Sequence, residues 1–432
     1  MADLLRICTA GSVDDGKSTL IGRLLYDSRG VYEDQVKSVE AASKNRTAGP
    51  IDFSLFTDGL RAEREQGITI DVAYRYFATA RRKFILADTP GHEQYTRNMA
   101  TGASTAEVAI LLVDARHGVR TQTQRHARIA SLLGIKHFVL AVNKMDLVDF
   151  DRSVFDRICN EFVGLTGGAH VAPIPMSALD GDNVITTSDR TPWYQGVSLL
   201  EHLETVTIDH DEAQGEFRMP VQLVLRPDHE FRGYAGQIVA GSLSPGDTVS
   251  VWPSGLSSRV TRIVTWDGDL DKAHAPMSVT VVLDDELDIS RGDVLATGAP
   301  HVGRRFTANL VWMDERPLDP HRLYLAKHNT RIVTAEVDRA MSLNEISVAT
   351  VSTSQPLVFD PYDDNRSTGS FVLIDPATNF TAGAGMIVRQ VRDHDSPAAG
   401  AMAERIAAAA RSASTHADAV EAVRRVLDEL LT

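Results

Sequence analysis

The chain is short of cysteine, of long apolar runs and of positive charge, and each shortage disfavours a class of protein. Its 432 residues include 2 cysteines, Cys8 and Cys159, without C-x-x-C spacing, which favours two reduced thiols in a cytoplasmic protein. The sequence contains no run of about 18 apolar residues, the length that a membrane-spanning helix needs. The charged residues Asp3 and Arg6 interrupt any signal-peptide pattern at the start. The formal net charge of −14 disfavours nucleic acid as a partner. We therefore expect a cytoplasmic protein that binds no membrane and no nucleic acid.

A glycine-rich stretch near the start carries the strongest single motif. Residues 11–18 read G-S-V-D-D-G-K-S, the G-x-x-x-x-G-K-S pattern of a P-loop, directly after the apolar run 4–8. In such a loop the backbone N–H groups wrap a polyphosphate, Lys17 reaches the β- and γ-phosphates, and the Ser18 hydroxyl can ligate Mg²⁺. Apolar residues recur at helical spacing over 16–27, so the helix dipole would point at the phosphates. The expected phosphate-binding residues are Gly11, Ser12, Val13, Asp14, Asp15, Gly16, Lys17, Ser18 and Thr19.

A second motif follows the apolar run 84–87, where D-T-P-G-H gives the D-x-x-G pattern of a switch loop. Asp88 can hold Mg²⁺, the Gly91 N–H can sense the γ-phosphate, and His92 can orient the attacking water. Thr69, downstream of a long polar stretch over 28–58, is interpreted as a switch residue that meets Mg²⁺ and the γ-phosphate. The expected nucleotide-binding residues of this motif are Asp88, Thr89, Pro90, Gly91 and His92. The expected metal ligands are Ser18, Thr69 and Asp88, and the expected catalytic residues are His92, Lys17 and Thr69.

Two further short motifs predict that the base of the nucleotide is guanine. The buried run 138–142 ends in N-K-M-D, where the Asp146 carboxylate can accept from guanine N1–H and the exocyclic amine, groups that adenine does not offer in this arrangement. Asn143 helps to fix the loop, and the Lys144 stem covers the base. After the run 171–176, S-A-L offers backbone N–H groups to the guanine carbonyl. These motifs add Asn143, Lys144, Met145, Asp146, Ser177, Ala178 and Leu179 to the expected nucleotide site.

Apolar periodicity divides the chain into an α/β part and a strand-rich part. Buried runs alternate with helical patterns up to about 206, which predicts a P-loop domain with a parallel sheet over 1–210. Short runs separated by Gly and Pro turns predict two antiparallel β-barrel domains, over 216–302 and 303–393. An Ala-rich tail over 394–432 is expected to form short α-helices, which either pack on the adjacent barrel or dock to a partner.

The motifs, in this order, resemble those of the translation-factor superfamily of GTPases, to which elongation factor Tu belongs. A closer resemblance is to the GTPase (large) subunit of bacterial sulfate adenylyltransferase, carried by residues 11–18, 60–72, 92–104, 228–236 and 288–293. The resemblance implies GTP and Mg²⁺ as ligands. It also implies that GTP hydrolysis drives a small, adenylyl-transferring partner subunit, which joins ATP and sulfate into adenosine 5′-phosphosulfate and pyrophosphate, the first step of sulfate assimilation.

Missing motifs limit what this chain itself can catalyse. It has no S-G-G-x-D-S pyrophosphate loop and no H-x-G-H, so adenylyl transfer is expected to reside in another polypeptide. No second G-x-x-x-x-G-K occurs, which argues against the fused adenylylsulfate kinase of some relatives. Whether a separate adenylylsulfate kinase also binds stays open. The rival hypotheses are a translation-factor-type GTPase carrying an RNA, which the acidic composition disfavours, and a nucleotide-bound scaffold that does not hydrolyse GTP.

Overall fold

The computed structural model describes residues 3–28, 39, 51–56, 69, 71–208, 215–228, 231–391, 420 and 423–424. The chain divides into an N-terminal unit, Met1–His210, and a C-terminal unit, Asp211–Thr432. The predicted helical tail, 394–432, lies outside the described residues except at positions 420, 423 and 424, and most of 28–58 also lies outside them. Within the described ranges, no helix is both long enough and apolar enough to cross a bilayer.

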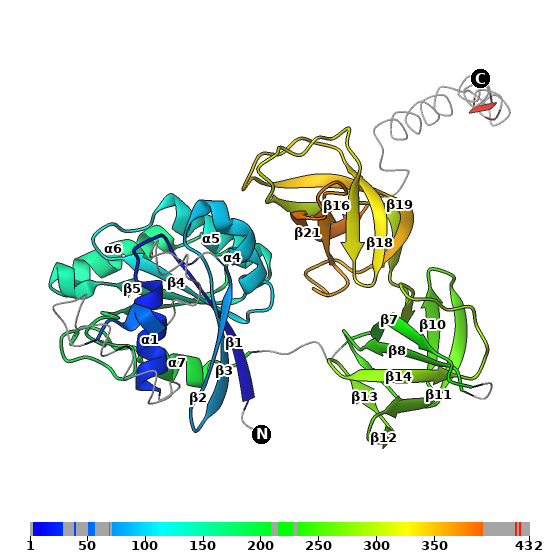
Figure 1. The fold of residues 1–432 in the computed structure, drawn as a ribbon, viewed down its shortest axis with the longest axis horizontal. Coiled ribbons are helices and arrows are strands. Elements are labelled where there is room, and N and C mark those ends of the chain that lie inside the picture. Colours follow the sequence, from blue (N-terminus) through cyan, green and yellow to red (C-terminus); the bar gives the residue numbers. More distant parts are fainter. Residues whose placement is uncertain are drawn as a thin grey trace. The chain divides into compact units, whose positions relative to one another are not determined.

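The N-terminal unit is built on a six-stranded sheet in the order β2-β3-β1-β4-β5-β6 (Figure 1). All neighbours are parallel except β2, which runs antiparallel to β3 at the edge. The strands are β1 (Asp3–Ala10), β2 (Ala73–Ala78), β3 (Arg82–Asp88), β4 (Val108–Asp114), β5 (His137–Asn143) and β6 (His170–Pro175). The helices are α1 (Lys17–Asp27), α4 (Thr96–Ala103), α5 (Thr121–Leu132), α6 (Arg152–Phe162) and α7 (Leu199–Thr205), with 3-10 turns at Phe53–Phe56, Glu93–Tyr95 and Met145–Val148.

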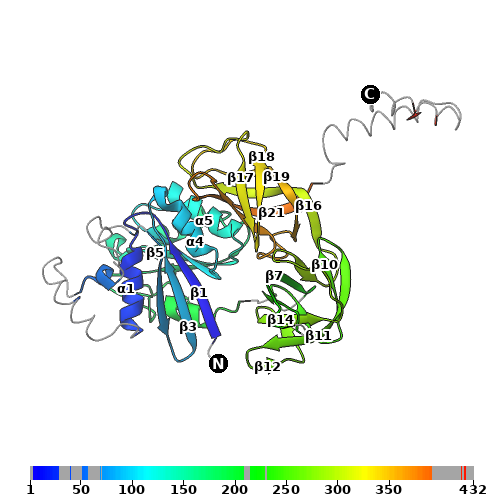
Figure 2. The same ribbon diagram turned by 45° about the vertical axis from the view of Figure 1, so that its right-hand side comes forward.

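Helices cover both faces of this sheet. The apolar side of α1 shares one core with Leu86 of β3 and with α7, and Figure 2 shows α1 running alongside the sheet. Ala87 comes next on β3 and points to the opposite face. On that face lies α4, where a Cβ on Gly102 would stand 3.4 Å from the Ala87 Cβ and 2.6 Å from the Thr89 Cγ2. Gly102 therefore lets α4 approach the end of β3 closely.

The first barrel of the C-terminal unit is antiparallel, as predicted. Its strands are β7 (Arg218–Leu225), β8 (Gly233–Gln237), β9 (Ser242–Leu243), β10 (Thr248–Trp252), β11 (Leu256–Thr265), β12 (Gly268–Asp269), β13 (Ala273–His274), β14 (Ser278–Leu283) and β15 (Val294–Ala296). The order β10-β15-β7-β8-β14-β11 closes because β10 also pairs with β11. Gly236 has a steric reason to be glycine, since a Cβ there would lie 2.5 Å from the Pro220 carbonyl oxygen.

The second barrel is also closed, in the order β16-β19-β18-β17-β20-β21. Its strands are β16 (His301–Trp312), β17 (Tyr324–His328), β18 (Arg331–Val337), β19 (Ile346–Phe359), β20 (Ser370–Ile374) and β21 (Thr381–Gln390). Phe306 lies at the centre, with its ring centroid 5.4 Å from those of both Phe359 and Phe371. β16 begins at His301, two residues before the expected domain start at 303.

Ion pairs between buried or half-buried residues join the two barrels within the C-terminal unit. The guanidinium of Arg218, on β7, lies 3.1 Å from the Asp360 carboxylate after β19. The guanidinium of Arg331, on β18, lies 3.0 Å from the carboxylate of Asp293. Asp293 belongs to the stretch 288–293 on which the family resemblance partly rests, so that stretch has a structural role at the joint between the barrels.

Candidate nucleotide site

The sheet brings the predicted motifs together because they follow parallel strands. The P-loop comes after β1, D-T-P-G-H begins at the last residue of β3, N-K-M-D begins at the last residue of β5, and S-A-L comes after β6. The register pairs Asp88 with Thr9 and Asn143 with Asp114. Parallel strands end at one edge of their sheet, which is where open α/β sheets bind ligands. All four motifs therefore lie at the same edge.

The P-loop is held in its curved shape by its own residues and by Asn143. The Asp15 carboxylate accepts a hydrogen bond from the Ser12 backbone N–H at 2.6 Å. Asp14 and Gly16 have φ of 67° and 95°, in the left-handed region that favours glycine. A Cβ on Gly16 would lie 2.4 Å from the Asn143 amide nitrogen, so a glycine is required there. Burial of Asp15, which is 2% exposed, raises its pKa to about 6.

Lys17 is a buried cation, and no anion from the described part of the chain lies beside it. Its side chain is 7% exposed, and its Nζ donates to the carbonyl oxygens of Gly11, at 3.1 Å, and Ser12, at 2.9 Å. Within the described residues, no carboxylate oxygen lies within 4.0 Å of this Nζ. Burial lowers the pKa of Lys17, and the more distant Asp88 charge only partly opposes that effect. The site therefore holds a positive charge that an incoming anion can neutralise.

The loop after β3 lies directly against the P-loop. Thr89 donates its hydroxyl to the Thr9 carbonyl oxygen at 2.5 Å, which ties this loop to β1. A Cβ on Gly91 would lie 2.4 Å from the Lys17 Nζ and 2.8 Å from the Gly11 carbonyl oxygen. Only glycine fits at this position. Gly91 therefore stands next to the expected phosphate-binding lysine, while Pro90 is buried beside it.

Asn143 links three of the motifs. Its amide nitrogen donates to the Asp15 carbonyl oxygen at 2.8 Å, and its amide oxygen accepts from the Ala178 backbone N–H at 2.9 Å. Lys144 adopts a left-handed conformation, with φ of 62°, and donates to the Asp14 carbonyl oxygen. One side chain therefore sets the position of the P-loop relative to the loop after β6.

The loop after β6 has a different set of available amides from the one expected. The Ala178 N–H is engaged by Asn143, and the Ser177 N–H donates to the Asp182 carbonyl oxygen at 3.3 Å. Leu179, whose side chain is 59% exposed, shows no hydrogen bond from its amide within the described residues. Met145 is fully buried, so its side chain belongs to the core, and Asp146 is half-buried.

The structure places the remaining predicted residues less completely. Ser18 and Thr19 lie in the first turn of α1, and Val13 is half-buried in the loop. His92 is half-buried after β3, and its Nδ1 accepts from the Gln94 backbone N–H at 3.3 Å. Thr69 is half-buried, but residues 57–68 and 70 on either side of it lie outside the described ranges.

Two residues important to this edge escaped the sequence analysis. Asp114, at the end of β4, lies 2.7 Å from the Arg116 guanidinium and 3.0 Å from the Lys144 Nζ. Burial alone would raise the pKa of Asp114, but hydrogen bonds from Arg116 and Lys144 hold it below its usual range. Arg23, on α1, donates to the carbonyl oxygens of Leu179 and Asp180 at 3.0 and 3.2 Å. An acid at the end of a buried strand is a usable signal for Asp114, whereas nothing local indicates the role of Arg23.

The residues at this edge fit Mg²⁺, which prefers oxygen ligands. Asp88 is 1% exposed at the end of β3, and its charge acts on the neighbouring Lys17. Ser18 supplies a hydroxyl from the first turn of α1. A buried carboxylate together with a hydroxyl oxygen is a donor set of the kind that Mg²⁺ shares with phosphate oxygens.

Comparison with protein families agrees with this geometry. The elongation factor Tu GTP-binding domain family matches residues 2–209, and the GTP-eEF1A C-terminal domain-like family matches residues 337–388. The fold and the site therefore define a P-loop GTPase of the translation-factor type, with two barrels after the GTPase domain. Among solved structures, sup35 complexed with GDP is 23% identical, with 91% of this chain and 95% of that chain covered and a TM-score of 0.40.

Curated relatives identify the family more narrowly. Sulfate adenylyltransferase subunit 1 of Bacteroides fragilis (strain YCH46) is 55% identical over 416 residues, which cover 91% of this chain and 87% of the relative. The subunit 1 of Teredinibacter turnerae is 53% identical, with 89% and 87% covered. The chain belongs to the sulfate adenylyltransferase subunit 1 family, which confirms the expected resemblance. It also matches the bifunctional enzyme NodQ of Rhizobium sp. (strain N33) at 53% identity, over 90% of this chain but 64% of NodQ.

Proposed function

We propose that this chain hydrolyses GTP to drive the synthesis of adenosine 5′-phosphosulfate and pyrophosphate from ATP and sulfate by a separate adenylyl-transferring subunit. The observation that carries the GTP-binding half of the proposal is Lys17, a buried cation in a P-loop with no carboxylate beside it in the described residues. The family of the chain supports the sulfate-activating half, since its relatives are named as subunit 1 of sulfate adenylyltransferase.

Coupling to GTP has a chemical reason. Sulfate is a poor nucleophile, and the mixed anhydride that it forms with adenylate lies uphill of ATP and sulfate. Hydrolysis of a second nucleotide can shift such an equilibrium only if the two reactions are linked, and a GTPase subunit bound to the catalytic subunit supplies that link. A separate adenylylsulfate kinase that bound the complex would consume the product there. The cytoplasmic location stays a prediction.

Different residues of the site bind the phosphates, the Mg²⁺ ion and the base of the nucleotide. Lys17 and the P-loop amides bind the β- and γ-phosphates, and Ser18, Thr69 and Asp88 hold Mg²⁺. When bound, Mg²⁺ would neutralise charge on the phosphate oxygens. The Asp146 carboxylate accepts from guanine, the Lys144 stem covers the base, and the Leu179 N–H is the available donor for the guanine carbonyl.

We expect His92→Ala to separate binding from hydrolysis. His92 orients the attacking water, so its loss should lower GTP turnover by about 10²-fold or more. GTP affinity should stay within twofold, because the imidazole does not hold the nucleotide. Single-turnover hydrolysis and equilibrium binding of GTP test the two halves separately. Unchanged hydrolysis in the variant would remove His92 from the mechanism.

Base specificity gives an independent test of the guanine site. Asp146→Asn reverses a hydrogen-bond acceptor into a donor, so the variant should lose affinity for GTP and gain relative preference for xanthosine triphosphate. The expected cost of the mismatched pair is about 1–3 kcal/mol. Competition binding with both nucleotides measures the ratio. A variant that kept the wild-type preference for GTP would contradict the assignment of Asp146.

Activity of the two-subunit complex tests the function as a whole. The chain is co-purified with the adenylyl-transferring subunit, and pyrophosphate release from ATP and sulfate is followed with GTP, with GDP and with no guanine nucleotide. We expect both the rate and the extent of adenosine 5′-phosphosulfate formation to rise with GTP alone. Equal formation in all three conditions would overturn the proposal. Tight GTP-dependent retention of tRNA on filters would instead support the RNA-carrying alternative.

A further inference from the structure

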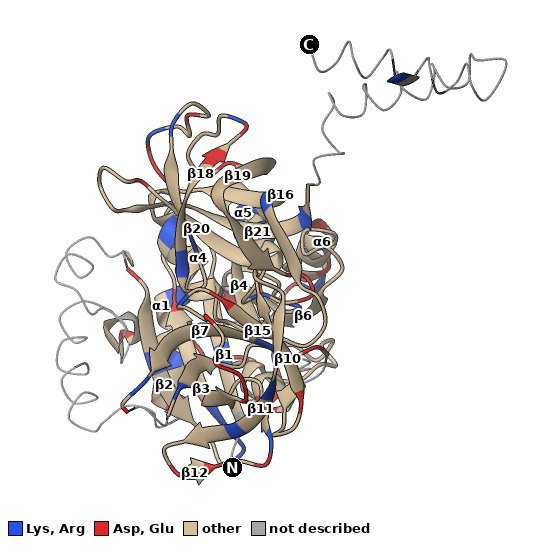
Figure 3. Ribbon diagram, turned by 90° about the vertical axis from the view of Figure 1, so that its right-hand side faces the viewer, with Lys and Arg blue, Asp and Glu red and all other residues tan. Residues whose placement is uncertain are grey.

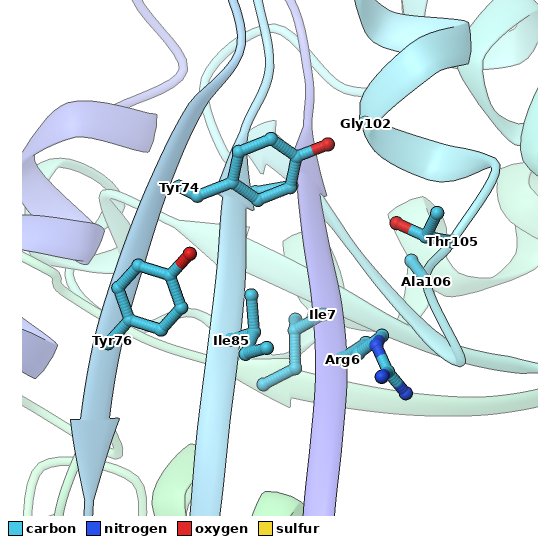
Figure 4. A pocket seen from close by; sticks show the side chains of 9 residues that line it. Arg6, Ile7, Tyr74, Tyr76, Ile85, Gly102, Thr105 and Ala106 are labelled. Atoms are coloured by element: carbon cyan, nitrogen blue, oxygen red, sulfur yellow. The ribbon is translucent and has the colours of Figure 1, made fainter. Parts of the chain in front are cut away.

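A groove lies on the N-terminal unit away from the P-loop, between the edge of the sheet and the end of α4. It has a volume of about 280 Å³ and is lined from β1, β2, β3 and the segment that ends α4, as Figure 4 shows. Ile85, Ala87 and Ala106 form its apolar floor and wall, while the Tyr74 ring and the Thr105 hydroxyl stand on opposite sides. A hollow of this size accommodates one or two side chains rather than a nucleotide.

Two tyrosines on the edge strand expose large parts of their aromatic side chains beside the groove. Tyr74 and Tyr76 of β2 are 42% and 66% exposed, and they pair in register with Ala87 and Ile85 of β3. Their side chains are therefore on the sheet face that also carries α4, at the end that α4 leaves uncovered. Tyrosine is enriched at the energetically important positions of protein interfaces because it buries a large ring at low entropic cost.

Two cationic side chains lie beside the groove, although the whole chain carries a net charge of −14. Arg6 and Lys83 are exposed neighbours on this face, since Lys83 precedes Ile85 by one strand period and Arg6 pairs in register with Ile85. Lys and Arg positions on β1 and β3 are blue in Figure 3. The nine lining residues include no carboxylate, and the adjacent Glu107 carboxylate accepts from the Arg6 backbone N–H at 2.8 Å.

Both walls of the groove are joined to the expected switch residues. Tyr74 follows Thr69 by five positions along the chain. On the other wall, Gly102 of α4 is so close to Thr89 that a Cβ would lie 2.6 Å from the Thr89 Cγ2, and Thr89 belongs to the loop that carries Gly91 and His92. A change in either switch on GTP hydrolysis would therefore change the separation or the tilt of these walls.

We propose that this groove docks a segment of the partner subunit, which places an aliphatic or aromatic side chain between β2 and α4 and carboxylates against Arg6 and Lys83. The inference rests on the proposed function, because it takes the adenylyl-transferring subunit as the partner. The apolar floor selects the buried side chain, and the two cations select acidic neighbours. Because both walls continue into the switches, the segment binds more tightly to one nucleotide state than to the other.

The test measures binding of the purified adenylyl-transferring subunit to the full chain loaded with a non-hydrolysable GTP analogue or with GDP. We expect Tyr76→Ala to weaken binding at least tenfold, which is about 1.4 kcal/mol. The double variant Arg6→Glu, Lys83→Glu should also weaken binding and should reduce its dependence on salt. GTP hydrolysis by each variant alone should stay within twofold of wild type, which shows that fold and nucleotide site are intact.

Matched controls come from α6 in the same unit, which follows β5 near the opposite edge of the sheet. Val163 is 77% exposed at the end of α6, so Val163→Ala controls for loss of exposed apolar surface. Arg152→Glu with Arg157→Glu controls for charge reversal, since both arginines are exposed on α6. These controls should bind the partner within twofold of wild type.

Three outcomes would overturn the inference. The groove variants could bind the partner as tightly as the controls do, or the wild-type chain could bind it equally in both nucleotide states. The variants could also lose self-association of the chain alone in sedimentation experiments, which would make a second copy the occupant. The proposed function fails separately, if the wild-type complex forms adenosine 5′-phosphosulfate without any need for GTP.

Discussion

The two units each bury a cation, and the two cations differ in their partners and in the direction of their pKa shifts. Lys17 in the P-loop is 7% exposed, and among the described residues its Nζ contacts only backbone carbonyl oxygens at hydrogen-bond distance. Burial lowers its pKa. Arg218 in the first barrel is 5% exposed, but it lies 2.7 Å from Glu216 and 3.1 Å from Asp360. Burial alone would lower the pKa of Arg218, and these two carboxylates raise it instead.

The difference separates a ligand site from a structural joint. An unpaired buried charge costs stability, and a protein keeps one where a ligand of opposite charge completes the site. A buried charge whose partners are already present cannot bind a further ligand of opposite charge. The charge of Arg218 instead holds one barrel against the other. The comparison therefore predicts that removing Lys17 abolishes function at no cost in stability, whereas removing Arg218 does the reverse.

The largest expected effect is that of Lys17→Met on GTP turnover. Methionine keeps most of the apolar stem but removes the charge that meets the β- and γ-phosphates, so kcat/KM for GTP should fall by about 10³-fold. Without nucleotide, the melting temperature should not fall, because the variant no longer buries a charge. Hydrolysis kinetics and thermal unfolding check both parts, with the exposed Lys136→Met as control. Loss of stability in the absence of nucleotide would show that Lys17 is a structural residue.

The next effect falls on stability alone. Arg218→Met leaves the Asp360 carboxylate without its main partner, which should destabilise the C-terminal unit by about 3–5 kcal/mol. Arg262→Met is a matched control, because its ion pair with Asp269 is exposed, with side chains 51% and 48% accessible, and should cost about 0–1 kcal/mol. Urea unfolding measures both, and GTP affinity under native conditions should be unaffected. A similar loss in the free energy of unfolding for the two variants would mean that burial of the Arg218 ion pair does not add to its contribution to stability.

Local patterns in the sequence were sufficient to predict much of the fold and the kind of site. The run 108–114 is apolar throughout except for its last residue, and it forms the fully buried strand β4 because parallel strands are covered on both faces. The four nucleotide motifs follow strands, so the topology of a parallel sheet was enough to bring them to one edge. The first barrel followed from turn signals between short apolar runs, although its shortest strands, β9, β12, β13 and β15, have too few residues to give a run of their own.

Features that depend on contacts distant in sequence could not be predicted. β21 has glycines at 383 and 385 inside a strand, because a Cβ on Gly385 would lie 2.2 Å from the Phe371 ring. α4 contains Gly102 for a similar reason, and its composition gives little helical signal. The hydrogen bond from Asn143 to Asp15 spans 128 positions. Such contacts explain why the motif residues were identified but their mutual arrangement, including the engaged Ala178 amide, was not.

The smallest expected effect concerns Asp15, which brings an acidic group into the same loop as the unpaired Lys17. Burial raises its pKa to about 6 in the folded chain, from 3.8 when unperturbed. Between these values the folded state binds more protons than the unfolded state, so stability falls as pH rises from about 4 to about 6 and then stays low.

Asp15→Asn should remove that loss, because the amide oxygen can still accept from the Ser12 N–H without carrying charge. At pH 7.5 the variant should be more stable than wild type by about 2–3 kcal/mol, and at pH 4 the two should differ little. GTP affinity should rise, since one negative charge near the phosphates is gone. Unfolding at both pH values measures the difference. The stability difference between the variant and wild type could instead be the same at pH 7.5 as at pH 4. That result would mean that Asp15 is paired well enough to stay ionised. The P-loop would then resemble the barrel joint, in which the buried Arg218 already has its carboxylate partners.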